Sequence, residues 1–145
     1  MITIEQLAPY LPYKVKIQIE TTDIRYETMI GIAPNDDDKY FKIQGDKFDL
    51  INELSWGLNC YCKPVLRPLS DLSKKIKHNN ETLIPTRVLE LRLGINDEYF
   101  GWDDHKTLLE WLSYDAVKLL LEWHFDIFGL IPEGLAVDMN TIKEH

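Results

Sequence analysis

The chain has 145 residues, of which 45% are hydrophobic, 11% aromatic and 28% charged. This composition excludes a disordered or collagen-like chain and favours one folded domain over residues 1–145. The formal net charge of −8 argues against a partner of duplex nucleic acid, because binding to phosphates needs clustered cations.

Membrane and secretion signals are also missing from the pattern. No apolar run reaches the roughly 18 residues needed to cross a bilayer, and the first residues lack the form of a signal peptide. The cysteines, Cys60 and Cys62, are too close for a relaxed disulfide within one strand, which is compatible with a reducing compartment. We expect an intracellular protein without a membrane partner.

The first third of the chain predicts a small antiparallel sheet. Thr3 can cap a short helix over 4–8, which Pro9 and Pro12 then interrupt. Strict alternation of polar and apolar residues over 14–20 predicts a strand, and further strands are expected over 24–33 and 39–44. Turns at 21–23 and 34–38 would join the three strands into a meander.

The middle of the chain is basic. Residues 63–92 contain seven Lys and Arg against three Asp and Glu, a net charge of +4. Pro64 and Pro68 bracket an extended segment, and Pro68 can begin a helix that continues to Ile76. A second helix is expected from Pro85 to a stop at Gly94.

The last third predicts amphipathic helices. Its apolar residues recur at steps of three and four, with Ser113 or Asp115 as the cap and Gly129 as the stop. Residues 104–128 form one long helix or two, and we favour two with a break near Ser113. The predicted fold is therefore α+β, with the N-terminal antiparallel β-meander packed on the C-terminal amphipathic helices.

Signatures of enzymes and cofactors are weak. Motifs for a nucleophile elbow, a dinucleotide fold and a P-loop are absent from the sequence, so we expect no cofactor and favour a non-enzymatic role. Zinc would need four ligands, and Cys60 and Cys62 have no second pair, so no metal site is predicted. The enzyme alternative is a small metal-dependent hydrolase, which would use Glu90, Asp103, Asp104 and His105.

The basic segment is the best candidate for a ligand site. Lys63 and Arg67 lie on a proline-stiffened stretch that leads into a predicted helix N-terminus, where an anion is favoured. With Arg87 they are predicted to contact the phosphate of a small nucleotide, while Trp56 or Trp123 stacks on its base. In the alternative interpretation, Arg67 and Arg87 pair with the acidic flanks and serve only the fold.

A partner protein would need a different surface. For that role the sequence suggests an exposed apolar patch formed by Phe125, Phe128 and Ile131. The aromatic helix could instead form a symmetric interface in a homo-oligomer.

Three blocks carry a resemblance to a known group: residues 7–13 (LAPYLPY), 63–72 (KPVLRPLSDL) and 122–136 (EWHFDIFGLIPEGLA). They resemble small uncharacterised proteins encoded by phages and prophages of Bacteroidetes. That group has no assigned activity, so the resemblance implies a setting in the cytoplasm of a bacterial host and transfers no site. The resulting expectation is a non-enzymatic binding protein, with counter-defence as one role, whose partner is a host protein or a small anionic nucleotide. The alternative in this setting is an accessory factor for phage replication or packaging.

Overall fold

The computed structural model describes residues 3–20, 24–34, 41–46, 62–95 and 112–142, and these form a mixed α+β protein, as predicted. The chain divides into two compact units. Unit 1 contains Met1–Leu66 and Leu130–His145, and unit 2 contains Arg67–Gly129. The single-domain organisation and the packing of the meander on the C-terminal helices stay predictions. Within the described ranges, no helix has both the length and the apolar character that a membrane span requires.

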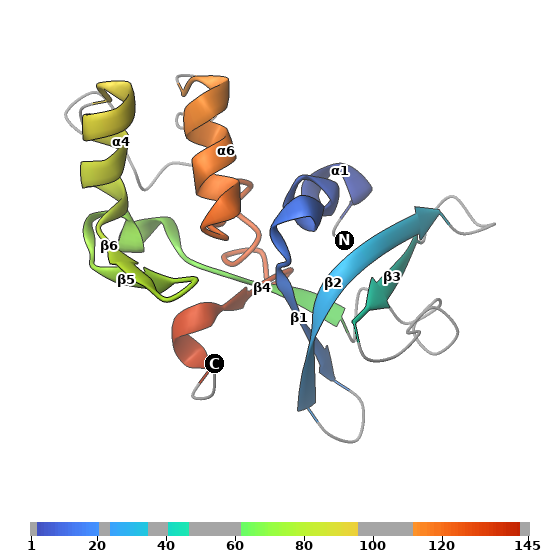
Figure 1. Cartoon of the computed structure of the whole chain (residues 1–145). Helices are drawn as coiled ribbons and strands as arrows, with labels where there is room; N and C mark the ends of the chain where they lie inside the picture. The colour runs from blue at the N-terminus through green and yellow to red at the C-terminus, as the bar shows by residue number, and fades with distance from the viewer. Residues whose placement is uncertain (1–2, 21–23, 35–40, 47–61, 96–111, 143–145) are drawn as a thin grey trace. The chain divides into compact units, whose positions relative to one another are not determined.

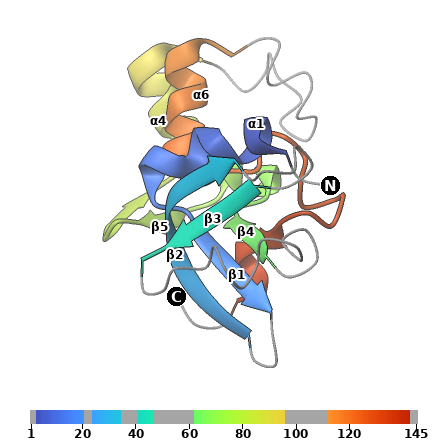
Figure 2. The same cartoon turned by 90° about the vertical axis from the view of Figure 1, so that its right-hand side faces the viewer.

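Unit 1 is built on a five-stranded sheet with the order β3-β2-β1-β4-β7 (Figures 1 and 2). The strands β1, β2 and β3 are antiparallel neighbours, which is the predicted meander. Strand β4 pairs antiparallel with β1, and β7 pairs parallel with β4. The bounds of the strands are β1 Lys16–Glu20, β2 Ile24–Pro34, β3 Phe41–Gly45, β4 Cys62–Leu66 and β7 Val137–Asp138.

The alternation in β1 explains how this sheet gains a buried face. Ile17 and Ile19 are at most 1% exposed, whereas Lys16 between Val15 and Ile17 is exposed. Successive side chains of a strand point to opposite faces, so the period of two places the isoleucines on the same side. In β2 the register with β3 shifts between Met29 and Gly31, which marks a β-bulge.

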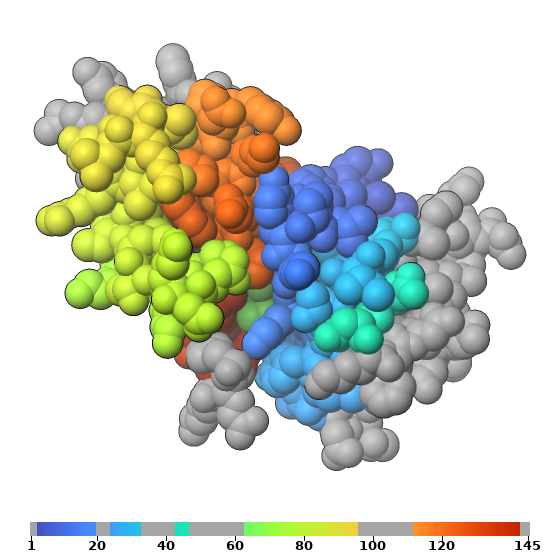
Figure 3. All heavy atoms as spheres, viewed as in Figure 1, coloured from blue at the N-terminus to red at the C-terminus, as the bar shows by residue number. Residues whose placement is uncertain are grey.

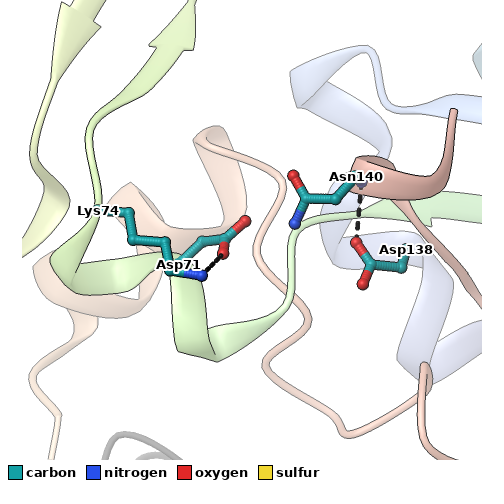
Figure 4. Close-up of polar contacts among 4 residues, drawn as sticks. All are labelled: Asp71, Lys74, Asp138 and Asn140. Carbon is teal, nitrogen blue, oxygen red and sulfur yellow. Dashed lines mark hydrogen bonds and ion pairs between the residues drawn. The ribbon is translucent and has the colours of Figure 1, made fainter. Parts of the chain in front are cut away.

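Unit 1 also contains the short helical segments α1, η1 and η4. Helix α1, Ile4–Leu7, begins at Thr3, whose hydroxyl accepts a hydrogen bond from the backbone N–H of Gln6 as predicted for a cap. The chain continues as the 3₁₀ helix η1, Ala8–Tyr13. Near the other end, Asp138 caps the 3₁₀ helix η4, Met139–Thr141, because its Oδ1 accepts from the backbone N–H of Asn140 at 2.9 Å (Figure 4).

The described residues of unit 2, 67–95 and 112–129, contain a β-hairpin and two α-helices of nine residues (Figure 1). The helix predicted from Pro68 to Ile76 is wrong. The chain there forms the 3₁₀ helix η2, Leu69–Ser73, and then turns into strand β5, Ile76–His78, which pairs with β6, Glu81–Leu83.

The turn between β5 and β6 explains why the chain forms a hairpin here and not a helix. Asn79 and Asn80 join the two strands, and both have positive φ angles, of 50° and 67°. Two consecutive residues of this kind suit the tight turn of a hairpin, and asparagine tolerates the conformation better than most residues. The pair therefore forms the tip of a hairpin, and Ile76 lies in a strand instead of at the end of the predicted helix.

Helix α4, Pro85–Leu93, agrees with the prediction. Proline is its first residue, and Gly94 caps its C-terminus in the left-handed conformation with φ of 68°. Proline lacks the N–H that the first helical position leaves without an intrahelical partner, and glycine adopts a positive φ without steric cost.

Helix α6, Tyr114–Glu122, begins as predicted but ends earlier. Ser113 is the N-cap, and its Oγ accepts from the backbone N–H of Ala116. The expected continuation to residue 128 is wrong, because the helix stops at Trp123 and His124 has a φ of 64°. The N–H of Phe125 then donates to the carbonyl of Leu120, and that of His124 to the carbonyl of Leu121, which is the Schellman arrangement of a helix end.

Candidate functional site

Two large apolar side chains are exposed on the helices of unit 2. Leu91, in the last turn of α4, is 85% exposed, and Tyr114, the first residue of α6, is 79% exposed. The helices contact each other and run in opposite directions, so these turns lie at the same end of the pair (Figures 1 and 3). Arg87 is also exposed and precedes Leu91 by one turn on the same side of α4. We call Arg87, Leu91 and Tyr114 the helix-pair surface.

The exposure of Leu91 follows from its position on the helix. Pro85 and Leu89 are buried, and they are four residues apart, which places them on the same side of α4. Leu91 follows Leu89 by two residues and therefore points roughly to the opposite side. The sequence analysis did not single out Leu91, although the 3.6-residue period of the helix separates it from the buried side.

Arg67 joins three segments of unit 2. Its Nε donates to the carbonyl of Trp123 at 3.0 Å, and its Nη2 donates to the carbonyl of Lys77 at 2.8 Å. Its backbone N–H donates to the carbonyl of His124 at 2.7 Å, while its own carbonyl accepts from Asp126 at 2.8 Å. Arg67 thus connects the start of unit 2 to strand β5 and to the chain that follows α6.

Two histidines lie beside this arginine. The rings of His78 and His124 meet edge to face, with their centroids 5.0 Å apart and an angle of 87° between their planes. Both side chains are half-buried. His78 ends strand β5, one residue after the carbonyl that Arg67 holds, and His124 follows the carbonyl bound by Nε. The hydrogen bonds of Arg67 therefore position both histidines.

The electrostatics of this cluster favour a neutral imidazole. Burial lowers the pKa of His78, the charge of Arg67 lowers it further, and the carboxylates of Glu122 and Glu81 oppose the shift. Burial also lowers the pKa of Arg67, with the opposite influence from Asp71. An arginine stays protonated at neutral pH despite such a shift. We call Arg67, His78 and His124 the Arg–His cluster.

The predicted ligand residues are dispersed over both units. Lys63 is half-buried on β4 in unit 1, whereas Arg67 and Arg87 belong to unit 2. Trp123 is 5% exposed, so its ring offers almost no face to a base. Trp56 lies outside the described residues.

The predicted apolar patch is not formed as expected. Phe125 is fully buried, which contradicts a position in an exposed patch. Phe128 is half-buried in unit 2, and Ile131 is half-buried in unit 1. Phe125 is buried because it follows the left-handed His124, and its N–H returns to α6 as part of the helix end.

The alternative role of Arg67, pairing with acidic residues, also takes a different form. Both hydrogen bonds described for its side chain go to backbone carbonyls. Asp71 is 5% exposed and forms an ion pair with Lys74 at 3.2 Å (Figure 4). Arg67 therefore supports the fold through carbonyl groups, while the charge of Asp71 opposes the lowering of the Arg67 pKa by burial.

The residues of the hydrolase alternative are only partly described. Glu90 is exposed on α4, whereas Asp103, Asp104 and His105 lie outside the described residues. In the part of the chain that the structure describes, no group of three or more His, Cys, Asp and Glu side chains gathers to hold a metal ion.

Comparison with known proteins adds no relationship. No protein-family model, no curated protein and no solved structure matches this chain. The function must therefore be argued from the two features of unit 2, the helix-pair surface and the Arg–His cluster.

Proposed function

We propose that this chain is a phage-encoded, non-enzymatic binding protein that captures a protein of the bacterial host. The observation that carries the proposal is the exposure of Leu91 and Tyr114 at the same end of two contacting helices. Removing the apolar surface of such side chains from water lowers the free energy, so a partner that covers them gains binding energy. A counter-defence role fits such an activity in a phage.

The chemistry of the helix-pair surface suits a protein partner. Tyrosine and arginine are enriched among the residues that dominate binding energies at interfaces. Tyr114 combines an apolar ring with a hydroxyl group, and Arg87 adds a cation one turn from Leu91. This surface favours a partner with an apolar pocket beside a carboxylate.

Capture of a base-stacked nucleotide is less well supported. The proposed stacking residue Trp123 is buried, and Arg67 already donates two hydrogen bonds to carbonyl groups. The packing of the N-terminal meander on the C-terminal helices, which the sequence predicts, remains part of this proposal.

The test uses a photoreactive amino acid placed at position 91 or 114 of the tagged protein in host lysate. We expect a crosslink to one host protein from both positions. The matched control places the same group at Ile24, which is 57% exposed on β2 in unit 1. Crosslinks only to a second copy of the chain would replace host capture by a homo-oligomer.

The affinity of each variant for the crosslinked protein is then measured and compared with that of the original protein. The double variant Leu91→Ser and Tyr114→Ser should bind at least about tenfold more weakly, because truncated interface anchors commonly cost more than 1 kcal/mol each. The variant Ile24→Ser should bind like the original protein. Equal affinity of the double variant would remove the proposal.

A further inference from the structure

We propose that β6 pairs with an extended strand of the host protein that the helix-pair surface captures. The added strand forms hydrogen bonds with the backbone of Thr82 and Ile84 and carries a carboxylate on the side of Lys77. This inference rests on the proposed function, because it names a second contact of the same partner. Three features of unit 2 support it: the direction of the backbone groups in the hairpin, the exposure of β6 and the charge beside it.

The two-residue turn of the hairpin determines which backbone groups point outward (Figure 1). The residues on either side of such a turn, here His78 and Glu81, exchange hydrogen bonds with each other. The next pair, Lys77 and Thr82, is then a non-hydrogen-bonded pair, whose N–H and C=O groups point away from the partner strand. The bond from Arg67 agrees with this direction, because its Nη2 donates to the outward carbonyl of Lys77 at 2.8 Å.

The opposite edge of the hairpin, formed by β6, is open. The N–H and C=O of Thr82 point outward there, and so does the N–H of Ile84, which continues the extended backbone with φ of −110° and ψ of 111°. Within residues 62–95 and 112–142, no hydrogen bond described uses any of these three groups. The carbonyl of Ile84, in contrast, accepts from the N–H groups of Arg87 and Val88 at the start of α4. This edge therefore offers two donors and one acceptor to another strand.

The side chains of β6 leave this edge accessible. Glu81 and Thr82 are both exposed, and successive side chains of a strand point to opposite faces. Neither face of β6 is therefore covered where an added strand would lie. An exposed strand edge is a template for a strand of another chain, in which main-chain hydrogen bonds supply affinity and neighbouring side chains supply specificity.

Lys77 gives the edge a preference for a carboxylate. Lys77 and Thr82 are cross-strand partners, so their side chains are on the same face, and Lys77 is exposed. A residue opposite Thr82 on an added strand would lie about 10 Å from Lys77, or two strand spacings, which the side chains of lysine and glutamate together can span. Glu81, on the other face, disfavours a second carboxylate opposite itself. We therefore expect the partner strand to carry a carboxylate opposite Thr82 and neutral or basic neighbours.

The edge adjoins the helix-pair surface along the chain. Ile84 follows β6 directly and is the N-cap of α4. Leu91 lies about two turns into that helix, roughly 10 Å from Ile84 along the axis at 1.5 Å per residue. A protein interface of ordinary size buries roughly 800 Å² on each partner, which is wide enough to include both places. One host protein can therefore contact the helix-pair surface and the edge of β6 together.

The first experiment measures amide hydrogen exchange by NMR in the isotopically labelled protein, alone and with the host protein that crosslinks from positions 91 and 114. We expect exchange of the Thr82 and Ile84 amides to slow at least about tenfold in the complex. The amide of Lys77 is the internal control, because it points outward at the opposite edge of the hairpin and should exchange equally in both samples.

The outcomes separate this inference from the proposed function. Unchanged exchange at Thr82 and Ile84 would overturn strand addition and leave capture by the helix-pair surface intact. If no host protein crosslinks from positions 91 and 114, the proposed function fails and strand addition fails with it.

Two variants of Thr82 distinguish the backbone from the side chain. Thr82→Pro removes the outward N–H and should lower the affinity for the host protein by about tenfold. Proline is tolerated on an edge strand where the N–H faces solvent, so the thermal midpoint should change little. Thr82→Val keeps the N–H and the branched shape, and it should bind like the original protein. Equal affinities of the two variants would refute pairing through this backbone.

The variant Lys77→Gln tests the carboxylate without changing the backbone of β6. It should weaken binding and make the affinity less dependent on salt, because one attraction between opposite charges is lost. An unchanged affinity with an unchanged salt dependence would refute a carboxylate opposite Thr82.

Discussion

Unit 1 and unit 2 are stabilised by different kinds of interaction. In unit 1 strand β1 pairs with a neighbour on each side, and the apolar residues of β1 recur at every second position. In unit 2 the turns depend on a few residues in special conformations, and Arg67 joins three segments through carbonyl groups. The repeated pattern of unit 1 spreads the stability over many residues, whereas unit 2 depends on a few residues.

The largest expected effect tests the core of unit 1. Ile17 is 1% exposed at the centre of the sheet, where it pairs with Glu27 on one side and Pro64 on the other. Ile17→Ala should lower the free energy of unfolding by about 2–5 kcal/mol, because it removes buried area and leaves a cavity. Urea denaturation measures this change, and backbone amide NMR spectra of the variant show whether unit 2 unfolds with unit 1.

The control for this change is another isoleucine of the same sheet. Ile24 is 57% exposed, and Ile24→Ala should alter the free energy of unfolding by no more than about 0.5 kcal/mol. Similar losses for Ile17 and Ile24 would contradict the described burial. Loss of the unit 2 signals together with those of unit 1 would show that the two units unfold as one.

A smaller effect is expected from Arg67 in unit 2. Arg67→Ala removes two hydrogen bonds to the carbonyls of Trp123 and Lys77, and it should cost about 1–3 kcal/mol of unfolding free energy. Arg67→Lys should recover only part of this loss, because an ammonium group cannot reproduce the planar fork. Chemical denaturation measures both variants.

An exposed arginine provides the comparison. Arg92, in the last turn of α4, should be replaceable by alanine at a cost of about 0.5 kcal/mol or less. If Arg67→Ala were as stable as Arg92→Ala, the stability of unit 2 would not be concentrated in that residue.

The smallest effect is a dependence of stability on pH. Since the pKa of His78 is lowered in the folded protein, the unfolded chain takes up the proton first as the pH falls. The contribution of His78 to stability is complete above the ordinary pKa of about 6.5 and is lost as the pH falls through the lower folded-state pKa. Burial is the largest cause of the lowered pKa of His78, Arg67 lowers this pKa further, and Glu122 and Glu81 oppose the shift.

Thermal midpoints across this pH interval check the assignment. His78→Gln should retain more of its stability than the original protein when the pH is lowered, since glutamine does not titrate. Parallel pH profiles for the two proteins would exclude His78 as the source of the dependence.

The sequence was most informative where local chemistry determines the structure. Alternation over 14–20 predicted β1, Thr3 and Ser113 were recognised as caps, and Gly94 marked the end of α4. In each case the decisive interaction joins residues that are close in the chain, or depends on the conformation of one residue. Such features can be read without knowledge of the tertiary structure.

Prediction failed at a local conformation that the apolar period does not reveal, and also where distant residues decide the outcome. The apolar period of α6 continues past its end, so nothing in that period shows that His124 adopts a left-handed conformation. The bonds from Arg67 to Lys77 and Trp123 join three separate segments. The Arg–His cluster was missed for the same reason, because His78 and His124 are brought together only by the folded chain.

The parallel pairing of β4 with β7 has a consequence for the order of folding during synthesis. Val65 pairs with Val137, and Leu66 with Asp138, so all of unit 2 is translated between the two strands. A ribosome adds roughly 5–20 residues per second, so for several seconds the edge of β4 has no partner strand from its own chain. Unpaired edges are where chains associate wrongly. Early folding of unit 2, with its local hairpin and helices, would let β7 pair with β4 soon after β7 is translated.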